Sequence, residues 1–85
     1  MKLPTVHING TSRDALTTGY TTAYHAVSDA LDALENVELN GRDYYPQGPH
    51  AFTEAIREHL ERCVALRVVR DQLCDIVQHL MEDAS

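Results

Sequence analysis

Asn40-Gly41-Arg42-Asp43-Tyr44-Tyr45-Pro46-Gln47-Gly48-Pro49 separates two long helical patterns and decides how the chain folds. The segment holds two of the four glycines and two of the three prolines of this 85-residue chain. Asn-Gly is a strong turn signal, and each proline disfavours helical conformation in the residue before it. We therefore expect a loop over residues 36–49, with one helix on either side.

The pattern before the loop predicts a helix over residues 12–35. Thr11 or Ser12 can cap its start, and Asp14 falls in the first turn, where the helix dipole favours an acid. Gly19 lies inside the pattern at a cost of roughly 1 kcal/mol relative to alanine, which a close helix crossing or a ligand contact would explain. The larger apolar residues recur at spacings of three and four, the period of one helical face: Leu16, Tyr20, Tyr24, Val27, Leu31 and Leu34.

The pattern after the loop predicts a longer helix over residues 50–83, with Pro49 or His50 at its start. At 1.5 Å per residue this helix would be about 51 Å long, against about 36 Å for the first. Between Cys63 and Val69 only Arg67 interrupts the apolar residues. Such a band is too broad for a single partner helix.

Together these patterns predict an all-α fold, an antiparallel two-helix hairpin in a single domain over residues 1–85. Residues 1–10 alternate in character and include Pro4, so we expect an extended N-terminal arm. The hairpin would leave the last two turns of the second helix uncovered, where Leu3, Val6 and Ile8 of the arm could lie. The remaining apolar surface predicts a homo-oligomeric helical bundle built on the second helix.

The charge is unevenly distributed along the chain. The net charge of −6 argues against nonspecific binding to nucleic acid. From Arg42 to Arg70 there are five arginines and four acids, whereas the rest of the chain has two bases and nine acids. Arginine suits phosphate or carboxylate ligands. Alternatively, these arginines form ordinary helical ion pairs: Glu54/Arg57, Glu58/Arg62, Arg57/Glu61 and Arg67/Asp71.

Two residue pairs have a spacing that could present metal ligands on one helical face: His59 with Cys63, and His50 with Glu54. Neither pair is accompanied by a second pair at a recognisable spacing. No nucleophile elbow, phosphate-binding glycine loop or paired-carboxylate motif is present. We expect no metal, no cofactor and no enzymatic activity.

Cys63 and Cys74 are expected to be reduced thiols. They would lie about 16 Å apart along one helix, too far to form a disulfide within the chain. No signal peptide and no apolar run of about 18 residues is present. These observations predict a soluble, intracellular protein with no membrane partner.

The loop and the helix after it supply the candidate ligand-binding residues. Aromatic rings could stack on a base or sugar, arginines could bind phosphate, and amides could read polar edges. The first turn of the second helix also favours an anion. Alternatively the loop is a stiff connector, with its tyrosines packed over Leu34 and Phe52; one tyrosine could pack while its neighbour stays free. The candidates are Asn40, Arg42, Tyr44, Tyr45, Gln47 and Arg57.

Two segments carry a resemblance to known proteins: His7-Ile8-Asn9-Gly10-Thr11-Ser12, and Gly41-Arg42-Asp43-Tyr44-Tyr45-Pro46-Gln47-Gly48. With the long helix that holds His59 and Arg62, they resemble a group of small uncharacterised proteins from tailed bacteriophages and prophages. In architecture and size the chain is also similar to phage helical-hairpin sponges, oligomers that sequester the cyclic nucleotides of bacterial immune systems. No sponge motif matches residue by residue, so the resemblance implies only a class of ligand.

Our first hypothesis is a non-enzymatic phage anti-defence protein in the cytoplasm of the bacterial host. It would oligomerise through the second helix and sequester a small anionic cyclic nucleotide near the loop. The rival is a protein-interaction module that inhibits a host defence protein through the acidic first helix or the loop. A third reading is a phage accessory or structural component.

Overall fold

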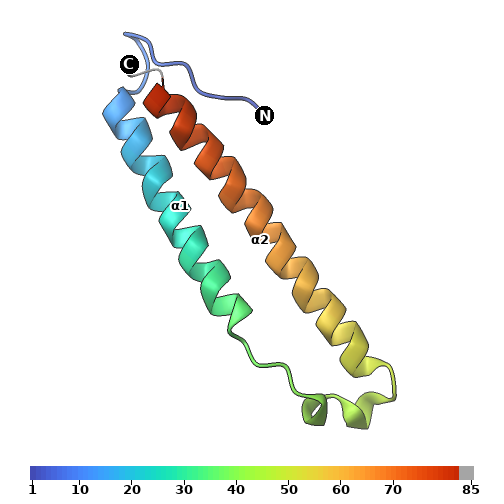
Figure 1. Ribbon diagram of the computed structural model, residues 1–85. Helices are drawn as coiled ribbons and strands as arrows, with labels where there is room; N and C mark the ends of the chain where they lie inside the picture. The colour runs from blue at the N-terminus through green and yellow to red at the C-terminus, as the bar shows by residue number, and fades with distance from the viewer. Residues whose placement is uncertain (83–85) are drawn as a thin grey trace.

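The computed structural model describes residues 1–82, most of which lie in two α-helices, α1 (Arg13–Glu35) and α2 (Ala51–Glu82). The helices pack side by side in opposite directions, so that α1 begins where α2 ends (Figure 1). No strand occurs in this part of the chain. The prediction of an all-α fold with two packed helices is therefore confirmed.

Local capping explains where α1 begins and ends. The Ser12 side chain accepts a hydrogen bond from the backbone N–H of Ala15 at 3.1 Å, so Ser12 is the N-cap that the sequence allowed. At the other end, Asn36 donates to the carbonyl of Asp32 through its backbone at 3.1 Å and through its side chain at 2.8 Å. Val37 N–H also donates to the Leu34 carbonyl at 3.1 Å, so two of the last four carbonyls of α1, which a helix end can leave without partners, accept hydrogen bonds.

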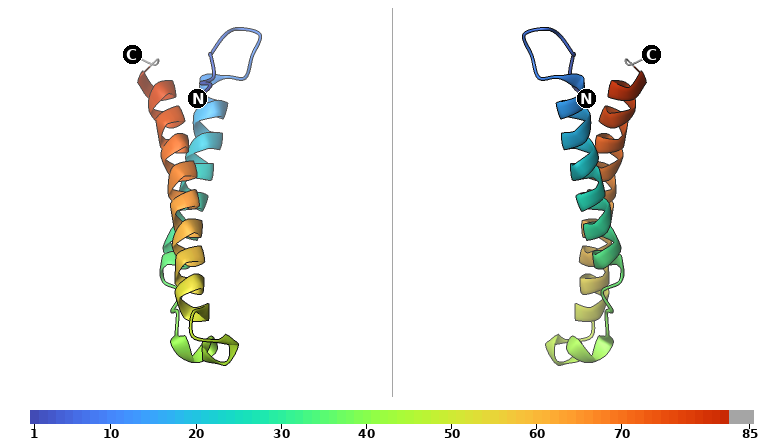
Figure 2. Two further views of the ribbon diagram at one scale, coloured as in Figure 1. Left: turned by 90° about the vertical axis from the view of Figure 1, so that its right-hand side faces the viewer. Right: turned by 90° about the vertical axis from the view of Figure 1, so that its left-hand side faces the viewer.

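One side of α2 forms a seam toward α1 and the loop. Its residues alternate at spacings of four and three, the heptad pattern of left-handed helix pairs, and all are buried or half-buried. Seen edge-on, the two helices cross at a shallow angle (Figure 2). The seam consists of Phe52, Ile56, His59, Cys63, Leu66, Arg70, Leu73, Val77 and Leu80.

The core between the helices is small. Only four of the described side chains are exposed by 8% or less: Leu31, Cys63, Ile76 and Leu80. A hairpin of two helices has no third layer to cover its outer faces, which is why most seam residues remain partly exposed.

The part of α2 that α1 leaves uncovered is its beginning and not its end. Arg13 Nη1 donates to the carbonyl of Leu80, which places the first turn of α1 beside the end of α2. Arg67 Nη2 donates to Glu35 Oε2 at 2.9 Å, so α1 ends level with the middle of α2. The prediction that the last two turns of α2 would be uncovered is therefore wrong. The connecting residues 36–50 are long enough to run along the first turns of α2 before the chain reverses (Figure 1).

The N-terminal arm crosses the end of the hairpin where α1 starts and α2 finishes (Figure 1). The Pro4 carbonyl oxygen lies 3.0 Å from Nε2 of His79, and Pro4 and Val6 are half-buried. Leu3 is 42% exposed and Ile8 is 97% exposed. The arm therefore contacts the end of α2, but Ile8 does not contribute to the covering that the sequence suggested.

Two short 3-10 turns, Gly41–Asp43 and Tyr45–Gln47, shape the loop before α2. Asn40 caps the first turn with its side-chain oxygen, and Tyr45 and Pro46 begin the second. α2 starts at Ala51, one residue later than the latest start that the sequence indicated. Its expected last residue, Asp83, lies outside the described residues.

The backbone requires glycine at position 48, whereas no neighbouring atom requires it at position 19. Gly48 has a φ of +118°, a conformation that side-chain-bearing residues rarely adopt, and it lets the chain turn into α2. A Cβ built at Gly19 would meet no atom within 4 Å. Among the described residues, no close helix crossing accounts for Gly19, which lines an open hollow of about 260 Å³ with Tyr20 and Leu73.

Candidate functional site

The structure does not bring the six candidate ligand-binding residues together within one chain. Asn40 and Arg42 form one pair, and Tyr44 and Gln47 line one hollow. Tyr45 projects into solvent, and Arg57 lies on α2 in a different hollow.

Arg42 differs from the other arginines of its region. Asn40 Oδ1 accepts hydrogen bonds from the backbone N–H of Arg42 at 2.9 Å and from its Nε at 3.2 Å. These bonds orient the guanidinium group without neutralising it, because the amide carries no charge. Within residues 1–82, Arg42 forms no ion pair, whereas four other arginines do: Arg57–Glu61 at 2.8 Å, Arg62–Glu58 at 3.5 Å, Arg67–Glu35 at 2.9 Å and Arg70–Asp71 at 3.2 Å.

These ion pairs also test the alternative explanation of the charge pattern, in which the arginines pair with acids on the same helix. Arg57 and Arg62 form the helical pairs with Glu61 and Glu58 that the spacing allowed. Arg67 instead bonds across to Glu35 of α1, and Asp71 pairs with its neighbour Arg70. Four of the five arginines between residues 42 and 70 are therefore paired with an acid within the chain.

The adjacent tyrosines have different environments, as consecutive side chains on a turn can. The Tyr44 ring lies 6.0 Å from the Phe52 ring, centroid to centroid, and Tyr44 is half-buried. Tyr45 is 75% exposed. Tyr44 thus closes the end of the hairpin, as the connector alternative proposed, and Tyr45 is the ring available for a ligand.

The hollow that Tyr44 and Gln47 line is unsuited to an anion. It has a volume of about 130 Å³, and Glu54 and Glu58 of α2 also line it. Two carboxylates beside so small a space repel phosphate. Of the candidate residues in the loop, Arg42 and Tyr45 are exposed and lie outside this hollow.

A row of exposed apolar side chains lies on the outside of α2. We call Leu60, Val64 and Val68 the outer row; they are 55%, 52% and 51% exposed. Their spacing of four places them along one side of the helix. Val64 directly follows Cys63 of the seam, so the two side chains point about 100° apart round the helix axis.

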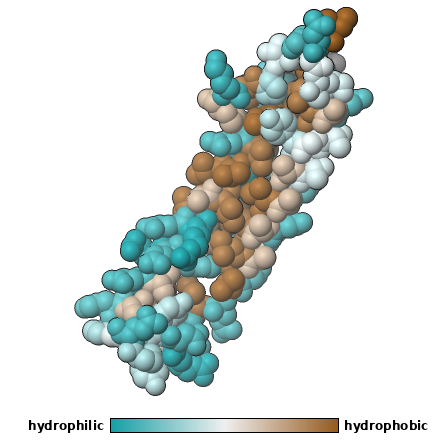
Figure 3. All heavy atoms as spheres, turned by 180° about the vertical axis from the view of Figure 1, so that it is seen from behind, coloured by the Kyte–Doolittle hydropathy of each residue, from teal (hydrophilic) through white to brown (hydrophobic). Residues whose placement is uncertain are grey.

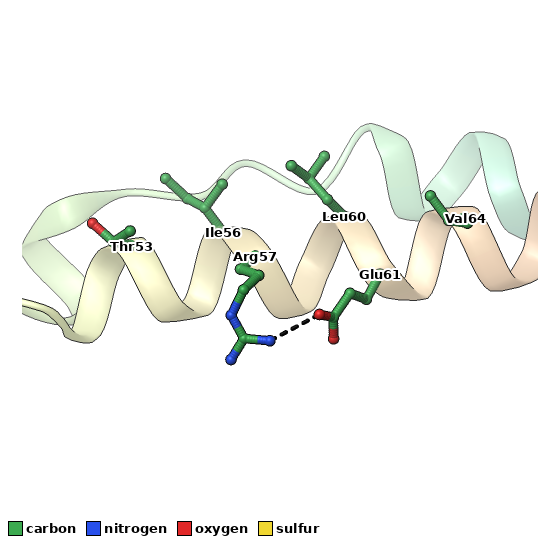
Figure 4. A pocket seen from close by; sticks show the side chains of 6 residues that line it. All are labelled: Thr53, Ile56, Arg57, Leu60, Glu61 and Val64. Atoms are coloured by element: carbon green, nitrogen blue, oxygen red, sulfur yellow. Dashed lines mark hydrogen bonds and ion pairs between the residues drawn. The ribbon is translucent and has the colours of Figure 1, made fainter.

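The outer row begins in a shallow hollow of about 490 Å³. In Figure 4 Ile56, Leu60 and Val64 lie along one edge of α2, and the Arg57–Glu61 ion pair projects from the other edge in this view. The space-filling view shows apolar side chains gathered in a band along the long axis of the molecule (Figure 3). The residues that line the hollow are Thr53, Ile56, Arg57, Leu60, Glu61 and Val64.

Sequence reasoning found the apolar excess of α2 but did not single out the outer row. The run from Cys63 to Val69 showed that more than one face was apolar. The signal that separates the faces is the heptad seam, because Leu60, Val64 and Val68 are the large apolar residues that fall outside it on one side.

The described residues include few other side chains that could bind a metal ion or act as a nucleophile. His59 Nε2 lies 3.8 Å from Cys63 Sγ, and Cys63 is 2% exposed. Among residues 1–82, no group of three or more histidine, cysteine or acidic side chains could hold a metal ion. Cys63 and Cys74 are free thiols. Over the same range, neither helix has the length and apolar character needed to cross a membrane.

No protein-family model, curated protein or solved structure matches the chain. The surfaces described above are therefore the basis for assigning a function. They are the apolar outer row of α2 and the exposed Arg42 and Tyr45 at the end of the hairpin.

Proposed function

We propose that this protein is a non-catalytic protein-interaction module whose first partner is a second copy of itself, bound through the outer row of α2. The observation that carries the proposal is the half exposure of Leu60, Val64 and Val68 beside an apolar hollow. Exposed apolar patches of this kind mark interaction surfaces.

The shape of the single chain supports self-association. A globular monomer of 9.5 kDa exposes about 5,000 Å², whereas this chain exposes 6262 Å². The difference of about 1,200 Å² exceeds the roughly 800 Å² that each partner contributes to a standard interface. The radius of gyration is 18.6 Å, against about 12 Å for a compact domain of this length.

Self-association would leave α1 available for a further partner. α1 carries four acids, Asp14, Asp29, Asp32 and Glu35, against Arg13 alone, and of these acids Glu35 pairs with Arg67 of α2. Such a surface suits a basic protein surface, because charge complementarity steers encounter and selects partners. Given the resemblance to phage proteins, that partner would be a host defence protein or another virion component.

Sedimentation equilibrium from low micromolar to near-millimolar concentration tests the proposal. The expected result is a concentration-dependent shift toward at least twice the 9.5 kDa mass of the chain. A mass of one chain throughout this range would refute self-association. The α1 partner is tested separately by cross-linking in infected cells, with the α1 acids replaced by their amides as the control.

A second candidate function is the capture of a small anionic nucleotide at the end of the hairpin, in the cytoplasm of a bacterial host. The specific observation in its favour is that Arg42 has no ion pair among the described residues and lies three positions before Tyr45, which is 75% exposed. An arginine and a free ring are the groups that bind phosphate and stack on a base.

Calorimetry against a panel of cyclic di- and trinucleotides tests this second function. Arg42→Ala and Tyr45→Ala should each abolish binding. Arg57→Ala is the matched control, because Glu61 already pairs with Arg57. An absence of binding heat with every nucleotide would exclude this function and leave the first proposal unaffected.

A further inference from the structure

We infer that the second copy binds antiparallel, with a two-fold axis passing beside Val64, so that Leu60 of each chain faces Val68 of the other and Arg57 faces Asp71. This inference rests on the proposed self-association and specifies its geometry. Three observations support it. The apolar residues of the outer row are equally spaced on either side of Val64, opposite charges flank this row, and α1 lies elsewhere on α2.

A two-fold interface brings residue i against residue j and residue j against residue i. When two copies of a helix run antiparallel, positions equidistant from the centre meet. Leu60 and Val68 each lie four residues from Val64. In the antiparallel dimer Leu60 of one copy therefore packs against Val68 of the other, and the reverse. The two Val64 side chains meet each other at the axis.

The flanking charges distinguish the antiparallel arrangement from the parallel one. Arg57 and Asp71 each lie seven residues from Val64, close to two helical turns, so both share its face. Within the chain Arg57 pairs with Glu61 and Asp71 pairs with Arg70, but the Arg57 and Asp71 side chains are 62% and 69% exposed, so each can also reach a charge on the second copy. The antiparallel arrangement sets opposite charges together, whereas a parallel arrangement would set each Arg57 against Arg57 and each Asp71 against Asp71, which is unfavourable.

The position of α1 leaves this face open. Residues of α1 line hollows together with Leu73 and Val77 of the seam. These two positions lie about 180° and 140° round the helix axis from Val64, so α1 docks on the other side of α2 from the outer row. The hollow bounded by Ile56, Arg57 and Leu60 is where Val68 of the second copy would pack. A standard interface needs roughly 800 Å² from each partner, less than the excess of about 1,200 Å² that the whole chain exposes.

Disulfide trapping tests the orientation. Leu60→Cys and Val68→Cys chains, both carrying Cys74→Ser and one carrying a mass tag, are mixed and oxidised. Facing residues form a disulfide only when their Cβ atoms lie about 3.5–4.5 Å apart, so we expect the mixed Leu60→Cys/Val68→Cys product to predominate. Val64→Cys, which lies at the axis, should give a homodisulfide, and Cys74→Ser alone should give none.

Charge reversal provides an independent test by sedimentation. Arg57→Asp and Asp71→Arg should each weaken self-association about tenfold, because two symmetric contacts become repulsive, and the double variant should restore it. Arg62→Asp is the matched control: Arg62 also pairs with a glutamate four residues away and is 61% exposed, but it lies on another face of α2.

Failure of this inference differs from failure of the proposed function. A wild-type chain that stays monomeric refutes both. A dimer that yields Leu60→Cys or Val68→Cys homodisulfides, or that Arg57→Asp leaves unchanged or strengthens, overturns the antiparallel arrangement while self-association stands.

Discussion

Val64→Asp is the substitution that most directly tests the proposed interface. Full burial of a valine or leucine side chain is worth about 1.5–3 kcal/mol, and Val64 is 52% exposed, so its burial in a dimer contributes about 1 kcal/mol per copy. Aspartate at this position removes that contribution twice. It also places two carboxylates opposite each other, which costs at least about 1 kcal/mol even in water.

The total of about 3 kcal/mol corresponds to a dissociation constant raised at least 100-fold, measured by sedimentation velocity over a range of concentrations. Val69→Asp is the control. Val69 is 41% exposed on the same helix, but it lies five residues further on and about 140° round the axis. Valine and aspartate have similar helix propensities, so neither variant should lose much helix. Equal weakening by both substitutions, or none by either, would refute the assignment of the outer row.

Three further predictions concern the fold. In urea denaturation, Leu80→Ala should lower the free energy of unfolding by about 2–5 kcal/mol because Leu80 is 0% exposed. Met81→Ala should lower it by under about 0.5 kcal/mol because Met81 is 62% exposed. Similar losses for the two variants would contradict the assignment of Leu80 to the core. Gly48→Ala should lower the free energy of unfolding by more than about 1 kcal/mol because Gly48 has a positive φ. Gly19→Ala should raise it by about 0.5–1 kcal/mol because no atom lies near the Cβ position. A loss of stability in Gly19→Ala would show that Gly19 makes a contact that the single chain lacks. In native alkylation followed by mass spectrometry, Cys74 should react before Cys63, which is 2% exposed; modification of Cys63 first would mean that the seam opens readily.

The helices could be predicted from the sequence because their signals are local. The recurrence of Leu16, Tyr20 and Tyr24 fixes one helical face, and Ser12 is a good cap wherever the rest of the chain goes. The loop was also readable, since Asn40-Gly41 and the prolines act on their immediate neighbours. Which end of α2 stays uncovered by α1 could not be predicted from the sequence, because it depends on the path of residues 36–50 through space.

The candidate site was only partly accessible from the sequence for a related reason. Composition showed that Arg57 and Arg42 were both available in principle, but only the helix geometry pairs Arg57 with Glu61 and leaves Arg42 bonded to an amide. The apolar excess of α2 was visible as a total. Which side chains remain outside depends on the direction from which α1 docks, and this is a tertiary property.

The distance between Val64 and the start of α2 sets the reach of any assembly. Val64 lies thirteen residues after Ala51, about 20 Å along the helix. Two chains related by a two-fold axis at Val64 would carry the starts of their α2 helices about 40 Å apart along the helix axis, with the loops that hold Tyr45 at opposite ends of the assembly. Such a particle would be bivalent: it could bridge two targets or engage a repeating surface, and its avidity would depend on the spacing of those targets.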